Sequence, residues 1–166
     1  FKQKTAYEIG VRLVGSEMCI RDRYKEAMKL RAAKPEHVLF LCVANSARSQ
    51  LAESIARSLA PSTVRISSAG SSPESLRTQA VEVMQEIGFD ISEYRSKSVD
   101  EVERPVDAVI TLCAEEACPV WLEEAVRLHW PIPDPAMVGG SRKEQMDAFR
   151  DARDELSRRL SVLFGV

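Results

Sequence analysis

The residues with the clearest chemistry are Cys42 and Arg48, which stand six positions apart, and Ser49, which follows the arginine directly. A cysteine thiolate is a nucleophile, and the planar guanidinium of an arginine can bind two oxygens of a tetrahedral oxyanion. A serine hydroxyl one residue on could donate a hydrogen bond to the cysteine sulfur. Together the three residue types predict nucleophilic attack on a bound tetrahedral oxyanion.

The spacing alone is a weak signal, because arginine is common in this chain and a buried structural cysteine could have one six residues on by chance. The flanking sequence is more restrictive. The apolar run 37–42 predicts a buried strand that ends at Cys42, and the pattern of 47–60 predicts a helix that opens near Arg48. Backbone N–H groups and the helix dipole would then bind an anion and favour a thiolate. The expected oxyanion loop consists of Val43, Ala44, Asn45, Ser46, Ala47 and Arg48.

From His37 onward, short apolar runs rich in β-formers alternate with longer stretches of helical period, which is typical of βα units. The predicted class is α/β, a three-layer sandwich around a four-stranded, mainly parallel sheet. We expect strands at about 37–42, 63–68, 107–112 and 126–129, and helices at about 47–60, 74–88 and 141–164. Ligands bind beyond the carboxyl ends of such strands, so the site should lie among the loops after Cys42, Ser68, Leu112 and Trp130.

Composition limits the classes of function. The chain has 166 residues, of which 45% are hydrophobic and 29% charged, which fits a globular domain with its own core. A net charge of -2 with interspersed basic and acidic residues argues against nucleic acid as a partner. Apolar runs much shorter than about 20 residues argue against a membrane span. Four cysteines are too few for a secreted disulfide scaffold, so we expect a soluble, cytoplasmic protein.

Residues 1–34 differ from the rest, since they contain no run that resembles a buried strand, and we assign the catalytic domain to 35–166. We expect the extension to be artefactual or disordered in part. Residues 18–23 resemble one reading frame of a transposon-end adapter used in DNA library preparation, which predicts that roughly residues 1–24 are a sequencing or assembly artefact. The alternative is a native helical extension. In either case Cys19 receives no role.

The segment from Val38 to Glu53 resembles the signature of the low-molecular-weight protein tyrosine phosphatase fold, and in particular its arsenate reductase branch. The resemblance continues through 68–70, 88–92, 95–98, 111–113 and 134–135, and covers nearly all of 37–166. Ala44 stands where the family usually has glycine. If that position requires a positive φ, alanine would be strained there.

The resemblance implies a mechanism in which Cys42 attacks an oxyanion held by Arg48 while a nearby acid protonates the leaving oxygen. The family's catalytic Asp-Pro pair falls at Asp134, in a loop that flanking prolines would stiffen. Without the resemblance, an aspartate in such a loop would most simply be a turn residue.

Two features favour a reductase over a phosphatase. After Pro135 the chain has Ala136 and Met137, where phosphatases of this fold usually place aromatic residues that stack on the tyrosine ring. Cys113 and Cys118 follow a predicted strand near the proposed site, and hydrolysis requires neither of them. The leading hypothesis is therefore reduction of arsenate.

In the reductases that the chain resembles, a second cysteine attacks the arsenylated first cysteine, and a third takes over the resulting disulfide and presents it to thioredoxin. The resemblance implies the order Cys42, then Cys113, then Cys118, with thioredoxin or a related thiol donor as partner. The four residues between the last two cysteines are fewer than in the best-known members. Cys118 could instead be a buried thiol in an enzyme that uses a low-molecular-weight thiol.

Other functions stay open. A phosphatase acting on phosphotyrosine or another phosphomonoester would use Cys42, Arg48 and Asp134, and a non-catalytic anion-binding domain is a third hypothesis. A zinc site would have to combine the two later cysteines with His129, and it lacks a fourth ligand.

Some members of the family hold a monovalent cation behind the catalytic loop. The positions that match are Asn45, Glu53, Ser68 and Asp100. All four side chains carry oxygen, so a potassium ion could bind there, and no other cofactor is expected. Their ordinary roles would be loop hydrogen bonds, a solvated helix face, turns and caps.

Overall fold

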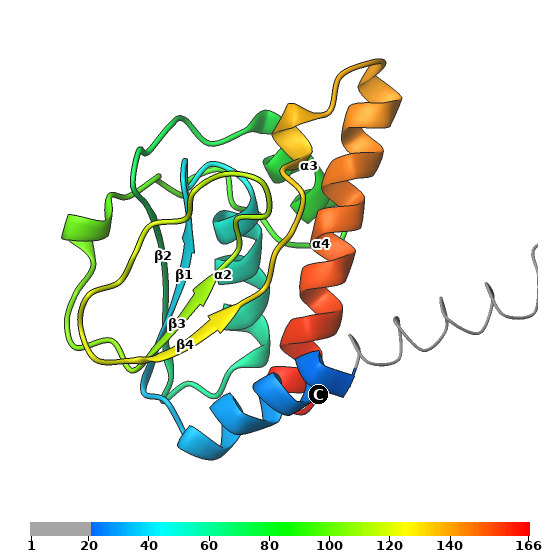
Figure 1. The fold of residues 1–166 in the computed structure, drawn as a ribbon. Coiled ribbons are helices and arrows are strands. Elements are labelled where there is room, and N and C mark those ends of the chain that lie inside the picture. The colour runs from blue at the N-terminus through cyan, green and yellow to red at the C-terminus, as the bar shows by residue number, and fades with distance from the viewer. Residues whose placement is uncertain (1–20) are drawn as a thin grey trace, which may run out of the picture.

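The computed structural model describes residues 21–166 (Figure 1). Four strands form one sheet in the order β2-β1-β3-β4, and every neighbouring pair is parallel, which confirms the predicted α/β class. The elements are β1 (His37–Cys42), α2 (Arg48–Leu59), β2 (Arg65–Gly70), α3 (Thr78–Gln85), η1 (Val99–Glu101), β3 (Ala108–Thr111), β4 (Val126–His129), η2 (Pro135–Met137) and α4 (Arg142–Phe164).

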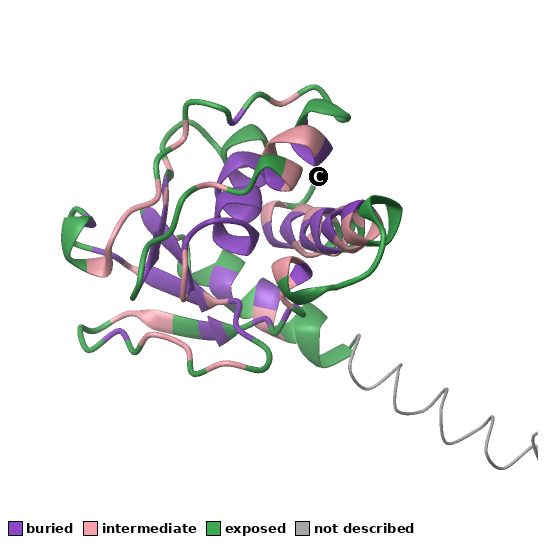
Figure 2. Ribbon diagram, turned by 90° about the horizontal axis from the view of Figure 1, so that it is seen from above, coloured by how far each residue is buried: buried purple, intermediate pink, exposed green. Residues whose placement is uncertain are grey.

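The sheet has a core on each face, because successive side chains of a strand point to opposite sides. Val38 and Phe40 of β1 face α2, α3 and α4, which cover one side and form the larger core. Leu39 and Leu41 face the other side, where the 3-10 turn η1 and irregular segments around Trp121 form the covering layer. Figure 2 shows α2 and the central strands as largely buried, whereas β4, at the edge of the sheet, has exposed and intermediate residues.

A helix over residues 21–33 packs on the predicted catalytic domain. Its Ala27 and Leu30 are buried in the larger core, and Arg23 lies 3.2 Å from Glu155 of α4. Figure 1 shows this helix next to the end of α4. The core of the fold therefore includes residues before 35, while most of the segment attributed to an artefact, residues 1–20, lies outside the described residues.

The predicted bounds of two elements are wrong. Strand β2 runs from Arg65 to Gly70, two residues later at each end than expected, and α3 runs from Thr78 to Gln85 instead of from about 74 to 88. The segment before α3 cannot be helical because its N–H groups donate to the loop after β1. The pairs are Ser72 to Val43, Glu74 to Ala44 and Arg77 to Ser46, at 2.9, 2.9 and 3.0 Å.

Helix α4 has clear signals at both ends. Ser141 and Glu144 form a capping box at its start, and Gly165 ends it with a φ of 73°.

Among residues 21–166, no helix has the length and apolar character that a membrane crossing requires.

Candidate active site

The candidate site lies where β1 ends. Cys42 is the last residue of β1 and is buried, and Arg48 is the first residue of α2, so the loop 43–47 joins a strand to a helix N-terminus. Gly70, at the end of β2, lies so close to this loop that a Cβ there would overlap the carbonyl oxygen of Val43. The neighbouring strand must therefore end in glycine for the loop to adopt this shape.

Two hydrogen bonds converge on the Cys42 sulfur. The Ser49 Oγ lies 2.9 Å from Cys42 Sγ, and the backbone N–H of Asn45 donates to the same sulfur over 3.2 Å. Asn45 Nδ2 also donates to the Ser49 hydroxyl oxygen over 2.7 Å, which leaves the hydroxyl hydrogen available to the sulfur. This arrangement stabilises negative charge on sulfur, as a nucleophilic thiolate requires.

Asn45 holds the loop in place. It has a φ of 48°, a left-handed conformation that asparagine tolerates, whereas Ala44 has no positive φ and the strain considered there is not present. Its Oδ1 accepts from the Lys97 N–H at 2.7 Å and from Gln50 Nε2 at 3.1 Å. Its carbonyl oxygen accepts from the Ser96 hydroxyl at 2.7 Å. One residue thus ties the loop to α2 and to the segment after α3.

Arg48 is only 3% exposed. Its Nη1 donates to the carbonyl oxygen of Ile132 at 3.1 Å, and its Nη2 lies 3.3 Å from Asp134 Oδ2. The other carboxylate oxygen of Asp134 accepts from the Ala136 N–H at 3.0 Å and caps η2. The structure therefore brings Asp134, from the loop after β4, to the arginine of the oxyanion loop.

Glu116 also binds the Arg48 guanidinium through Nη2, and sequence reasoning gave it no role. Partial burial acts to raise the pKa of Glu116, but the hydrogen bond and charge of Arg48, with backbone N–H groups of the loop, lower it below its usual range. The only signal in the sequence was an acidic pair between two cysteines, and acidic residues are too common in loops to mark a site.

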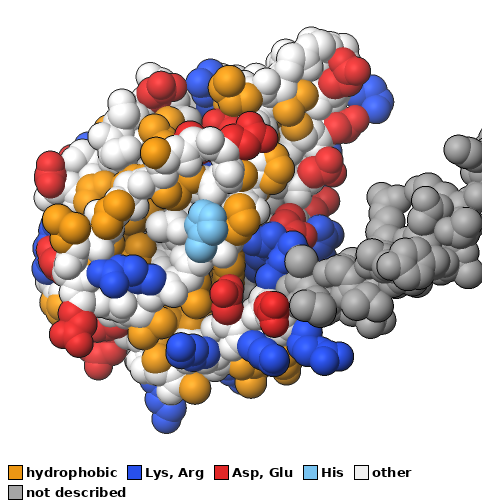
Figure 3. Space-filling model, in the orientation of Figure 1, with side chains coloured by type: hydrophobic (Ala, Val, Ile, Leu, Met, Phe, Trp, Pro, Cys, Tyr) orange, Lys and Arg blue, Asp and Glu red, His pale blue; other side chains and the backbone are white. Residues whose placement is uncertain are grey.

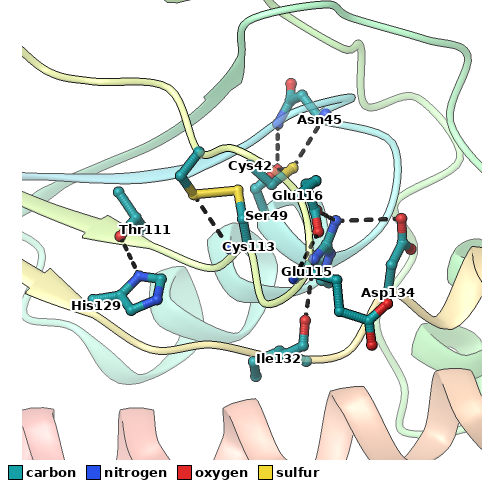
Figure 4. Close-up of a disulfide and its surroundings, with 12 residues drawn as sticks. Cys42, Asn45, Ser49, Thr111, Cys113, Glu115, Glu116, His129, Ile132 and Asp134 are labelled. Atoms are coloured by element: carbon teal, nitrogen blue, oxygen red, sulfur yellow. Dashed lines mark hydrogen bonds and ion pairs between the residues drawn. A yellow bond between two sulfur atoms is a disulfide. The ribbon is translucent and has the colours of Figure 1, made fainter.

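Cys113 and Cys118 form a disulfide, with a Cα–Cα distance of 5.4 Å. Cys113 is 1% exposed and Cys118 is half-buried, while Cys42 is a free, buried thiol. Figure 4 places the disulfide beside the Cys42 loop. In this disulfide form neither sulfur is free to bind zinc, and His129 Nδ1 lies 2.8 Å from the Thr111 hydroxyl.

A family model described as low molecular weight phosphotyrosine protein phosphatase matches residues 37–165. The chain belongs to this family. An arsenate reductase of Halalkalibacterium halodurans is 38% identical over 128 residues, covering 75% of this chain and 92% of the relative. An arsenate reductase of Bacillus subtilis is 37% identical over 126 residues, covering 74% and 91%.

Solved structures agree with the assignment. The arsenate reductase of Archaeoglobus fulgidus has a TM-score of 0.64 and 28% identity, covering 78% of this chain and 99% of that protein. A structure described as an arsenate reductase in the phosphate binding state has a TM-score of 0.66 and 28% identity, covering 78% and 97%. Both likenesses extend over nearly the whole of the known protein.

Three of the four residues considered for a monovalent cation adjoin one another. Asn45 Nδ2 donates to Ser68 Oγ at 2.9 Å, and the Ser68 hydroxyl donates to the buried Glu53 carboxylate. Asp100 is exposed in η1, where its backbone N–H bonds to the Ser98 hydroxyl. A cation at these four positions stays a prediction.

The buried Glu53 carboxylate already has two cationic partners. Lys97 Nζ lies 3.4 Å from one oxygen, and Arg57 Nη2 lies 2.5 Å from the other. A buried carboxylate requires such compensation, because removal from water costs several kcal/mol per ion. In this chain the positive charge behind the loop comes from its own side chains.

Proposed function

We propose that this protein reduces arsenate to arsenite, with Cys42 as nucleophile and with Cys113 and Cys118 as the pair that ends each turnover as a disulfide. The observation that carries the proposal is the Cys113–Cys118 disulfide next to the loop that contains Cys42 and Arg48. Ester hydrolysis consumes no electrons and needs no such pair. The curated relatives described above are named arsenate reductase.

The first step forms a bond between Cys42 sulfur and arsenic. Arg48 and the N–H groups of the loop hold the oxyanion, and one arsenate oxygen leaves as water after protonation. We assign the role of proton donor to Asp134. Its position supports this role, because its carboxylate lies 3.3 Å from Arg48 Nη2 at the edge of the same site.

The next steps transfer two electrons. The Cys113 thiolate attacks the Cys42 sulfur, a sulfur–sulfur bond forms, and the sulfur–arsenic bond breaks with its electron pair left on arsenic, so arsenic(V) leaves as arsenite. Cys118 then attacks Cys113, which forms the Cys113–Cys118 disulfide and returns Cys42 as a thiolate. One dithiol is oxidised for each arsenate reduced.

A dithiol donor must then reduce the disulfide, and we place this step in the cytoplasm with thioredoxin or a related protein as donor. The half-buried Cys118 supports this assignment, because a protein thiol can reach it more easily than the buried Cys113. The exposed side chains of Val120 and Leu122, 75% and 89% accessible, provide apolar surface next to it. Figure 3 shows apolar side chains among interspersed charges on the face of the molecule that Figure 1 views.

A phosphatase is the second candidate, because the matched family is named for phosphotyrosine hydrolysis and the set Cys42, Arg48 and Asp134 suits both reactions. Met137, in the turn after Asp134, is exposed and aliphatic, so this turn offers no aromatic ring to a phosphotyrosine. This feature favours the small inorganic oxyanion.

One experiment distinguishes the two. Fully reduced protein, freed of reductant, is mixed with arsenate, and its disulfides are mapped by mass spectrometry while arsenite is measured. We expect one arsenite per protein molecule and a Cys113–Cys118 bond. Cys118→Ser should stop at a Cys42–Cys113 disulfide, and Cys42→Ser should yield no arsenite. The matched control is Cys19→Ser, which should behave as the parent. Unchanged thiols with rapid hydrolysis of p-nitrophenyl phosphate would favour the phosphatase.

A further inference from the structure

Glu116 occupies an unusual position in the chain, within the four-residue segment that the Cys113–Cys118 disulfide closes. Its Oε1 binds Arg48 Nη2, the same nitrogen that Asp134 approaches. Figure 4 shows Glu116 and Asp134 directed at the guanidinium from different segments. With the disulfide formed, a carboxylate of the protein therefore binds the arginine of the oxyanion loop.

A carboxylate and a tetrahedral oxyanion are alternative ligands of one guanidinium. Both bind through charge-assisted hydrogen bonds to its planar N–H groups. Arg48 Nη1 donates to the carbonyl oxygen of Ile132, and Nη2 is a group over which Glu116 and an incoming anion compete. The lowered pKa of Glu116 keeps this carboxylate charged at neutral pH, so it remains a competitor.

The loop itself holds the Glu116 carboxylate in place. The Glu115 N–H donates to Glu116 Oε2 over 3.2 Å, while Oε1 faces Arg48. The disulfide keeps the Cα atoms of Cys113 and Cys118 5.4 Å apart, which restricts the segment between them. A tethered ligand acts at an effective concentration on the order of 1 mM, so a free anion must exceed that level or bind more tightly.

The contact is also able to open. The Glu116 side chain is 29% exposed, and Ala114, Glu115 and Ala117 of the same segment are exposed to solvent. Once the disulfide is reduced, no covalent bond restrains this segment between its ends. Glu116 can then exchange Arg48 for water, while the Asp134 carboxylate and the Ile132 carbonyl oxygen stay beside the guanidinium.

We propose that Glu116 is an internal carboxylate ligand that fills the oxyanion site in the disulfide form and leaves it when Cys113 and Cys118 are reduced. This proposal rests on the function above, since it takes the oxyanion site and the disulfide as parts of one cycle. Its consequence is an order of events: the dithiol donor acts before the next oxyanion binds. An oxidised enzyme then does not hold arsenate that it cannot reduce.

Phosphate binding tests the proposal, because phosphate has the geometry of arsenate and does not oxidise the thiols. Isothermal titration calorimetry compares the disulfide and dithiol forms of the full chain. We expect the disulfide form of the parent to bind phosphate at least about tenfold more weakly than the dithiol form, as a tethered competitor predicts. Glu116→Gln should narrow this ratio to about twofold by raising the affinity of the disulfide form.

The matched control is Glu115→Gln, which removes the same charge from the adjacent, exposed residue that does not bind Arg48. It should keep the tenfold ratio of the parent. Equal affinities of the two parent forms would overturn the proposal, and so would an equal rise in both glutamate variants, which would indicate a general charge effect. Thermal melting of each form checks that the variants are folded.

The result of the phosphate titration can be distinguished from the result of the turnover experiment that tests the proposed function. If no arsenite forms in the turnover experiment but the phosphate ratio still depends on Glu116, the reductase assignment fails and the carboxylate ligand stands. If arsenite forms and the ratio is unaffected by Glu116→Gln, the ligand proposal alone is wrong.

Discussion

Asn45 meets two demands that no other residue type meets together. The backbone of the oxyanion loop needs a left-handed residue at this point, with a φ of 48°, and the loop also needs side-chain bonds to Ser49, Ser68 and Lys97. Glycine would supply the backbone conformation without the bonds, and alanine would supply neither. The residue thus determines both the shape of the loop and the position of the Ser49 hydroxyl.

Substitution of Asn45 separates these two contributions. Asn45→Gly and Asn45→Ala both lose the side-chain bonds, but alanine also adopts a strained φ. We expect Asn45→Ala to be less stable than Asn45→Gly by roughly 0.5–1 kcal/mol in urea unfolding, since the strain exceeds the entropy that alanine saves. Equal free energies of unfolding would contradict the argument. Both variants should lose oxyanion turnover.

Ser49 acts on the nucleophile through one hydrogen bond. Ser49→Ala removes the donor that lies 2.9 Å from Cys42 Sγ, and a hydrogen bond to a charged group contributes about 1.5–3 kcal/mol. We expect kcat/KM for arsenate to fall by about tenfold to a hundredfold. Ser54→Ala, on the same helix, is the matched control and should stay within about twofold of the parent. A similar loss in both variants would indicate a packing effect.

At the scale of elements, the local periodicity of apolar residues is sufficient to predict the bounds of a strand or helix that forms mainly because its side chains are buried. β1 and β4 were predicted with the right ends and α4 within one residue, and an apolar run marks β1 while an apolar stripe marks α4. The start of α3 could not be predicted, since the segment 72–77 bonds to a loop some thirty residues earlier. The register of β2 likewise depends on its pairing of Arg65 with His37.

The site follows the same division. Cys42, Arg48 and Ser49 share one strand, loop and helix, so their proximity follows from local structure that the sequence predicts. The Arg48 contact with Glu116 depends on the conformation of a loop closed by a disulfide, and no local pattern encodes it. Non-local contacts between charged loop residues are the part that required the structure.

The packing of α3 on α4 includes an ionic cluster at Glu86. Glu86 binds both Arg150 and Arg153, and the hydrogen bond from Arg150 is the largest cause that lowers the pKa of Glu86 below 4.5. A lowered folded pKa means that the contribution to stability is present above pH 4.5 and is lost as the pH falls through the lowered value. The cluster therefore stabilises the fold at neutral pH but not in strong acid.

The Glu86→Gln variant tests whether the Glu86 cluster stabilises the fold at neutral pH and not in acid. We expect its melting temperature at pH 7 to lie below that of the parent by a few degrees at most, since Glu86 itself is partly exposed and water screens its ion pairs. The difference should shrink as the pH falls below 4.5, where Glu86 of the parent becomes protonated. Glu93→Gln, at an exposed position, is the control and should show no such dependence. A pH-independent difference would point to packing instead of charge.

At the scale of the whole molecule, the helix over residues 21–33 belongs to the folded unit. Leu30 is fully buried among residues of the larger core, and Lys29 next to it is exposed. We expect Leu30→Ala to lower the free energy of unfolding by about 2–4 kcal/mol through loss of apolar contact and a cavity. Lys29→Ala should change it by less than about 0.5 kcal/mol. Urea unfolding of both variants measures the free energy of unfolding. Equal losses in the two variants would mean that the helix adds nothing to the stability of the core.

Electrons should enter the molecule at Cys118. The two cysteines of the disulfide differ in their exposure to solvent. Cys113 is only 1% exposed, whereas Cys118 is half-buried and the exposed Val120 and Leu122 follow it in the sequence. A donor thiolate that attacks Cys118 releases Cys113 as the thiolate on the inner side, where it is needed for the next attack on Cys42. A thioredoxin variant with a single active-site cysteine should therefore form a mixed disulfide with Cys118, identified by peptide mapping. Capture on Cys113 would contradict this direction of electron flow.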